Sequence, residues 1–287
     1  MSDFNAQVFQ NPYLPENGEH VNAVLTIQCN AVQSRPDPLT LGAIIDCSGS
    51  MGEGRRIQQA KKAVAALIEV LPEEAHFFVI AGNHESALVV PSFPATPENK
   101  IMALSRLQTI NATEGTAMSQ WLQAARAQFR SSRPGIHRAV LLTDGKNDNS
   151  DPLSQVLTEC AGEFQVDARG VGLDWQPNQL RQIAEKLLGT VDIVADPGHL
   201  QEDFLGILKS ALGKAIAEVK IRLWTPQGAQ AEFLKVVSPE INDITALGKT
   251  DPTQPQLREY PLAPGEKKPV ITIFVSGLSR AKLAKGC

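Results

Sequence analysis

A short apolar run that ends in clustered oxygen side chains constrains this chain more than any other feature. Residues 41–45 read LGAII and lead directly into Asp46-Cys47-Ser48-Gly49-Ser50. A continuous apolar run of this kind is typical of a strand that is buried on both faces of a parallel sheet. Ligands of open α/β sheets bind just beyond the carboxyl ends of such strands. Asp46, Ser48 and Ser50 are therefore candidate ligands for a hard cation such as Mg²⁺.

Segments with strand and helix patterns alternate along residues 39–216. Apolar residues recur at helical spacing from Ile57 to Leu71, for example, whereas 76–81 and 139–142 are short apolar runs. This alternation predicts an α/β fold, with a doubly wound, mostly parallel sheet and helices on both faces. The remaining expected helices lie at 97–107, 121–129, 153–160, 180–188 and 200–216, and the remaining strands at 87–90 (an antiparallel edge), 164–171 and 191–194.

The two ends of the chain follow a different, β-type pattern. Four segments favour antiparallel strands: 21–27, 219–224, 231–237 and 271–275. Residues 8–18 and 239–265 have loop composition, and a short helix is possible at 279–285. We therefore expect three parts: residues 1–36 contributing to a small antiparallel β domain, 37–216 forming the α/β domain, and 217–287 completing the β domain.

Charge and terminal composition limit the classes of partner. The formal net charge of −4 argues against nucleic acid as the main partner. Residues 1–5 lack the basic and apolar regions of a signal peptide, and no apolar run reaches the roughly 20 residues that span a bilayer. The four cysteines are scattered without CxxC pairing. Together these features predict a cytoplasmic protein with reduced thiols and no membrane partner.

Two further polar residues stand at comparable points of the α/β pattern. Thr116 lies in a polar loop that opens a helix, and Asp144 ends the strand in Leu141-Leu142-Thr143-Asp144-Gly145. If the two buried strands are neighbours, both loops open on the same sheet edge as the one after residue 45. Two carboxylates and three hydroxyls would then surround one point, which suits Mg²⁺.

These residues resemble the von Willebrand factor A domain and its metal-ion-dependent adhesion site. Asp46-x-Ser48-x-Ser50 matches the DxSxS motif, Thr116 the distant threonine and Asp144 the distal aspartate, over about residues 39–216. The resemblance implies an intact site for Mg²⁺, with Mn²⁺ or Ca²⁺ as alternatives. It also implies a non-enzymatic module in which a partner protein supplies an Asp or Glu to the metal. In the family, binding is coupled to a shift of the threonine loop and of the final helix, here 200–216.

A narrower resemblance rests on Tyr13-Leu14-Pro15, on residues 170–175 and on residues 222–226. These are similar to a bacterial cytosolic group that accompanies stress and tellurite-resistance-type proteins. The last strands of that group run longer, so the resemblance implies that the β domain is truncated at Cys287. Related domains also serve as adaptors for AAA+ ATPases of the chelatase or MoxR kind, which is the alternative function.

Other interpretations of the same residues remain open at this stage. Ser48 or Ser50 could cap the following helix, Thr116 could cap its own, and Asp144 could be a turn residue. No GxxxxGK[ST] loop supports nucleotide hydrolysis. A metal-dependent hydrolase is disfavoured because Cys47 is the one thiol beside the site and no histidine is positioned to activate it. His84 and Trp175 lie on loops that could border the metal and touch a partner. The partner and the oligomeric state are not specified.

Overall fold

The structure is a computed structural model, and its contacts divide the chain into two compact units. Residues 36–217 form one unit, and residues 1–35 together with 218–287 form the other. The residues that the structure describes are 3–11, 13, 20–30, 37–144, 147–171, 177–194, 196–216, 219–225, 229–238, 241–263, 265–266, 270–276 and 279–280.

The first unit is built on a six-stranded sheet with the order β5-β4-β3-β6-β7-β8. All neighbouring strands are parallel except β5, which pairs antiparallel with β4 at the edge. The predicted α/β fold, with its antiparallel edge strand, is confirmed. The bounds are β3 (Leu39–Asp46), β4 (His76–Gly82), β5 (Ser86–Pro94), β6 (Ile136–Thr143), β7 (Gln165–Val171) and β8 (Val191–Val194).

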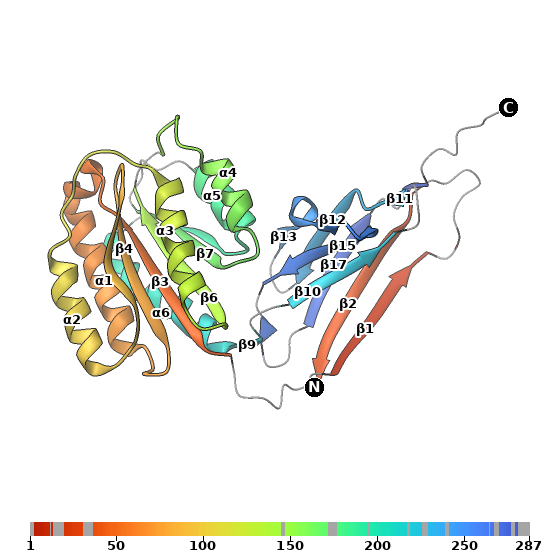
Figure 1. Ribbon diagram of the computed structural model, residues 1–287, viewed down its shortest axis with the longest axis horizontal. Helices are drawn as coiled ribbons and strands as arrows, with labels where there is room; N and C mark the ends of the chain where they lie inside the picture. The colour runs from red at the N-terminus through yellow and green to blue at the C-terminus, as the bar shows by residue number, and fades with distance from the viewer. Residues whose placement is uncertain are drawn as a thin grey trace. The chain divides into compact units, whose positions relative to one another are not determined.

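Helices cover both faces of this sheet (Figure 1). Side chains of α1 (Arg56–Val70), α2 (Pro97–Gln108) and α6 (Leu200–Gly213) pack into one buried cluster with alternate residues of β3, such as Leu41 and Ile45. Ile44 points to the opposite face, where it packs with side chains of α3 (Met118–Ser131), α4 (Leu153–Cys160) and α5 (Pro177–Lys186). This strand is therefore buried on both faces, as the unbroken apolar run predicts.

Three short elements differ from expectation in this unit. The turn after β3 is a 3-10 helix, η1 (Gly49–Arg55), and a second one, η2 (Pro197–His199), precedes α6. Helix α6 ends at Gly213 rather than at residue 216, and Lys214–Ile216 form β9. In the described part of the chain, no helix is both long enough and apolar enough to cross a membrane.

The second unit is made of antiparallel strands from both ends of the chain, as predicted. Its sheets have the orders β1-β2-β17-β12-β13 and β10-β15-β14, and β11 pairs with β18. The bounds are β1 (Asp3–Gln10), β2 (Asn22–Asn30), β10 (Val219–Trp224), β11 (Ala229–Gln230), β12 (Phe233–Ser238), β13 (Asn242–Asp243), η3 (Thr245–Leu247), β14 (Lys249–Asp251), β15 (Gln254–Leu262), β16 (Gly265–Glu266), β17 (Val270–Ser276) and β18 (Ser279–Arg280).

Three predictions for this unit were wrong. Residues 8–10 belong to β1, not to a loop, because an edge strand held by backbone pairing with β2 needs no buried face. Residues 254–262 form β15 although they fall in the stretch given loop composition, and its two prolines, Pro255 and Pro261, sit near the strand ends, where they are tolerated. Ser279–Arg280 pair as a strand instead of starting a helix. The end of the chain at 283–287 lies outside the described residues.

Candidate metal centre

The predicted ligands lie at the point where the strand order reverses. The central strand β3 has β4 on one side and β6 on the other, so the chain winds outward from it in both directions. Asp46 is the last residue of β3, and Asp144 directly follows β6. Ligands of open α/β sheets bind in the crevice at such a reversal, at the carboxyl ends of the strands.

The loop after β3 directs its hydroxyls into one cluster. The Ser48 backbone N–H donates to Asp46 Oδ1 at 2.7 Å, and the hydroxyl oxygens of Ser48 and Ser50 lie 3.2 Å apart. Neither serine caps a helix through its side chain: α1 has Arg55 at its N-cap position, and Ser48, at the N-cap position of η1, makes no side-chain capping bond. The capping interpretation of these serines is therefore wrong, and their hydroxyls face oxygen atoms instead.

Asp144 closes the cluster from the neighbouring strand. The Ser50 hydroxyl donates to Asp144 Oδ1 at 2.7 Å, and Arg56 Nη1 donates to Asp144 Oδ2 at 2.5 Å. The Thr143 hydroxyl donates to Asp46 Oδ2. Both carboxylates are buried. Hydrogen bonds thus connect four of the five predicted ligand residues in one series, Asp46–Ser48–Ser50–Asp144.

Thr116 lies in a loop that backbone hydrogen bonds hold beside the residues after β3. The Thr113 backbone N–H donates to the Cys47 carbonyl at 2.6 Å, and the Ala117 N–H donates to the Asn83 carbonyl at 2.8 Å. Thr116 itself is buried. Within residues 37–144 and 147–171, no hydrogen bond joins its hydroxyl to the four connected residues. Helix α3 starts later, with Ala117 at its N-cap, so the alternative interpretation, in which Thr116 caps this helix, is wrong.

His84 supports the same loop from the turn between β4 and β5. One ring nitrogen of His84, Nδ1, lies 3.1 Å from the Glu114 carbonyl oxygen. Gly115 has φ +87°, and a Cβ there would come within 2.6 Å of the His84 Cβ, so the turn leaves no room for a side chain. The His84 side chain is exposed, which leaves it accessible to a partner. Trp175 lies outside the described residues.

Two residues of the cluster were missed by the sequence reasoning, Thr143 and Arg56. Thr143 is the last residue of β6, and nothing in the strand pattern distinguishes its hydroxyl from any other. Arg56 offered a signal: it is the first residue of α1, where a positive charge opposes the helix dipole, and the first turn contains no acidic residue. A cation in that position indicates a carboxylate nearby in space.

Burial dominates the electrostatics of Asp46. Removal from water raises the pKa of its carboxyl to about 6, although hydrogen bonds from Thr143 and Ser48 act in the opposite direction. The neighbouring Asp144 charge raises it further. Ionising Asp46 in the metal-free protein is therefore unfavourable, and a bound cation would relieve this cost.

Cys47 faces away from the oxygen cluster, as strand alternation predicts. Its Sγ donates to the Gly82 carbonyl at 3.2 Å, and its side chain packs in the buried cluster under α1. Burial raises the pKa of this thiol to about 11. Cys47 is thus a protonated core residue at neutral pH, neither a thiolate ligand nor a nucleophile.

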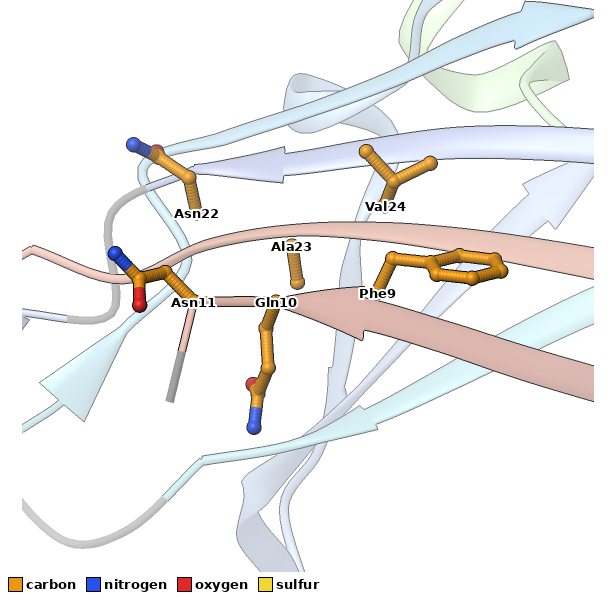
Figure 2. A pocket seen from close by; sticks show the side chains of 6 residues that line it. All are labelled: Phe9, Gln10, Asn11, Asn22, Ala23 and Val24. Carbon is orange, nitrogen blue, oxygen red and sulfur yellow. The ribbon is translucent and has the colours of Figure 1, made fainter. Parts of the chain in front are cut away.

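The donor set fits a hard divalent ion. Carboxylates and hydroxyls are the oxygen ligands that Mg²⁺, Mn²⁺ and Ca²⁺ accept, and the side chains of the predicted ligands offer oxygen atoms only. Within the described ranges no three or more His, Cys, Asp and Glu side chains gather at one point, and this cluster itself contains two carboxylates. A pocket on β1 and β2 is lined by Phe9, Gln10, Asn11, Asn22, Ala23 and Val24, none of which is ionisable (Figure 2). The cluster at the sheet edge is therefore the candidate site.

The stabilising effect of Mg²⁺ is expected to grow as the pH rises through about 6. Because the folded-state pKa of Asp46 is raised above 3.8, protonation of this group favours the native state, and that contribution is lost as the pH rises. A metal needs the ionised form. Melting temperatures in EDTA and in Mg²⁺ should differ little at about pH 5 and clearly at about pH 7.5. Equal shifts at both pH values would contradict the assignment, and Asp46→Asn should abolish the pH-dependent difference.

Comparison with known proteins agrees with the sequence motifs. The family model for the von Willebrand factor type A domain matches residues 41–204. A solved von Willebrand factor type A structure from Catenulispora acidiphila is 33% identical, with a TM-score of 0.88, and the match covers 98% of this chain and 66% of that one. An uncharacterized protein from Synechocystis sp. is 27% identical over 216 residues, which are 72% of this chain and 50% of that protein. Inter-alpha-trypsin inhibitor heavy chain H4 from Homo sapiens is 29% identical over 150 residues, 48% of this chain and 16% of that protein.

The matches cover only part of each of these relatives. The chain spans half or less of the length of these two relatives, so the similarity concerns a domain and not their whole architecture. The family match covers more than half of this chain and includes Asp46, Ser48, Ser50, Thr116 and Asp144. Domains of this type commonly mediate protein–protein interactions, and they often bind a divalent metal. The chain belongs to the von Willebrand factor type A domain family.

Proposed function

We propose that this protein is a non-enzymatic, metal-dependent binding module that takes an acidic side chain from a partner protein. The metal would be Mg²⁺, with Mn²⁺ or Ca²⁺ as substitutes. The observation that carries the proposal is the hydrogen-bonded series Asp46–Ser48–Ser50–Asp144, which brings carboxylate and hydroxyl oxygens together from the ends of two neighbouring strands. The residues that would hold the ion are Asp46, Ser48, Ser50, Thr116 and Asp144.

The charges around the site favour an incoming carboxylate. When bound, the ion supplies a Lewis-acidic position for an oxygen ligand. The serine and threonine hydroxyls are neutral, so only two carboxylates oppose the double positive charge. Arg56 adds a further positive charge at 2.5 Å from Asp144. The loaded site would thus be net positive in a buried surrounding, where attraction for an Asp or Glu is stronger than in water.

The setting we propose is a bacterial stress-response or signalling assembly in the cytoplasm. Support comes from the narrower sequence resemblance at residues 13–15, 170–175 and 222–226, and from the acidic balance of the chain. A hydrolytic role has little support, because the thiol beside the site, Cys47, is held protonated by burial.

The test is capture of partners with and without metal. The chain is immobilised, exposed to extract of the native organism in Mg²⁺ or in EDTA, and the bound proteins are identified by mass spectrometry. A partner should be retained in Mg²⁺ only, should be lost with Thr116→Ala, and should be retained with Thr158→Ala, which removes an exposed hydroxyl on α4. Replacing one Asp or Glu of that partner should abolish capture.

Two outcomes would redirect the proposal. Equal capture in EDTA and Mg²⁺ would contradict metal-dependent binding. Metal-dependent recovery of an AAA+ ATPase would identify the partner class and favour the adaptor role.

A further inference from the structure

We infer that Arg56 is an internal counter-cation that competes with the divalent ion for Asp144 and thereby sets the affinity of the site for metal. This inference deepens the proposed function and rests on it. Arg56 is not part of the ligand motif, yet it would control how tightly the site binds a divalent ion.

The contact between the two groups is short and shielded from water. Arg56 Nη1 lies 2.5 Å from Asp144 Oδ2, and the side chains are 16% and 0% exposed. Interactions between charges in such surroundings are stronger than at a protein surface. Removing one partner of a buried ion pair leaves the other uncompensated, so this pair matters to the protein without metal.

Arg56 occupies a position that is unfavourable for a cation in its own helix but lies beside the Asp144 carboxylate. A cation at the first position of a helix is unfavourable, and the first turn of α1 contains no acidic residue to balance it. The two preceding residues, Gly54 and Arg55, have φ values of +54° and +63°. For Arg55 this left-handed conformation is costly. Two locally unfavourable features thus occur at the start of α1, where Arg56 pairs with Asp144.

Arg56 and a metal would draw on the same carboxylate. Asp144 Oδ1 accepts from Ser50 and Oδ2 accepts from Arg56, so both oxygens already have partners. An ion that uses Oδ2 must displace the guanidinium, and an ion that uses Oδ1 remains close to its positive charge. In both cases Arg56 weakens metal binding, while in the metal-free protein it keeps Asp144 compensated.

The experiment compares Arg56→Gln with Arg55→Gln in the full chain. Arg55 is exposed and makes no side-chain cap, so its replacement removes the same charge without touching Asp144. Titration calorimetry with Mg²⁺ alone should show binding about tenfold tighter or more for Arg56→Gln and nearly unchanged for Arg55→Gln. Arg56→Lys keeps the charge and should stay near wild type. The Arg56→Gln melting temperature should fall in EDTA, and the deficit should shrink or reverse in saturating Mg²⁺.

The outcomes separate this inference from the proposed function. If wild type binds Mg²⁺ and Arg56→Gln binds it equally or more weakly, with the same loss of melting temperature in EDTA and in Mg²⁺, Arg56 is only structural and the inference is overturned. If wild type does not bind but Arg56→Gln does, the inference holds and the proposed function of the native chain fails. If neither binds Mg²⁺ or Mn²⁺, both are overturned.

Discussion

Replacing Asp46 with alanine is expected to weaken Mg²⁺ binding by about a hundredfold or more, the largest effect of any single change at the site. Asp46 supplies one of two carboxylates, and it also positions the rest of the cluster by accepting from the Ser48 backbone N–H and from Thr143. Its loss removes charge that attracts the ion and releases the loop that carries both serines. The measurement is titration calorimetry with Mg²⁺ and with Mn²⁺ at about pH 7.5, above the Asp46 pKa of about 6.

The matched control is Glu74→Ala, which removes an exposed carboxylate just before β4, at the opposite end of the sheet from the cluster. Its Mg²⁺ affinity should equal that of wild type. In EDTA, Asp46→Ala should not unfold the protein, because burial of this carboxyl is itself unfavourable. Undiminished Mg²⁺ binding by a folded Asp46→Ala protein would show that the metal, if any, binds elsewhere.

The α/β fold could be predicted because its signals are local and repeated. The apolar run before Asp46 and the helical spacing from Ile57 to Leu71 each specify one element, and their alternation leaves few topologies. The β unit was harder. β1 is an exposed edge strand whose formation depends on backbone pairing with β2, and that pairing leaves no periodic apolar pattern in residues 3–10. The other neighbour of β2 is β17, which comes from the opposite end of the chain at residues 270–276.

The proximity of four of the five proposed ligand residues could be predicted, but the side chains that hold them in place could not. Asp46, Ser48 and Ser50 follow one strand, and Asp144 follows its neighbour, so strand order alone brings them together. Arg56 and Thr143 act through long-range contacts, with sequence separations of 88 and 97 residues to their partners. Such contacts carry no local signal apart from the misplaced charge at the start of α1. Arg56 and Thr143 thus help to position the proposed ligands, and their contacts can be identified only in the folded structure.

The second large expected effect concerns stability. Asp167→Asn is expected to lower the free energy of unfolding by about 3–5 kcal/mol. Asp167 is fully buried and accepts from Arg138 Nε at 2.5 Å and Nη2 at 3.1 Å, and from the Thr190 N–H and hydroxyl at 3.0 and 2.7 Å. Burial alone would raise its pKa, but the bonds and charge of Arg138 outweigh burial and lower it. The stability it contributes is therefore present at neutral pH and is lost only as the pH falls through that lowered value.

Urea unfolding at neutral pH tests this, with Glu163→Gln as the matched control. Glu163 also accepts from two arginines, Arg126 and Arg130, but it is partly exposed, so its loss should cost less than about 1 kcal/mol. Similar costs for the two variants would contradict the burial argument. A double replacement, Arg138→Met with Asp167→Leu, should recover most of the stability, because it removes the unpaired charge rather than creating one.

The same buried network bears on function through α6. Arg138 also donates to Ser210 Oγ at 3.3 Å, and Arg169 Nε donates to Asp203 Oδ2 at 2.6 Å, so two arginines of the sheet are bonded to this helix. The helix shift that the family resemblance implies must break or rearrange these bonds. Asp167 lies in the first half of β7, away from the carboxyl ends where the cluster sits. Asp167→Asn should therefore loosen α6 and lower the free energy of unfolding while leaving Mg²⁺ affinity unchanged. Asp46→Ala should instead weaken Mg²⁺ binding while leaving the protein folded. The two variants together distinguish effects on the metal site from effects on α6, the helix whose shift the family resemblance implies.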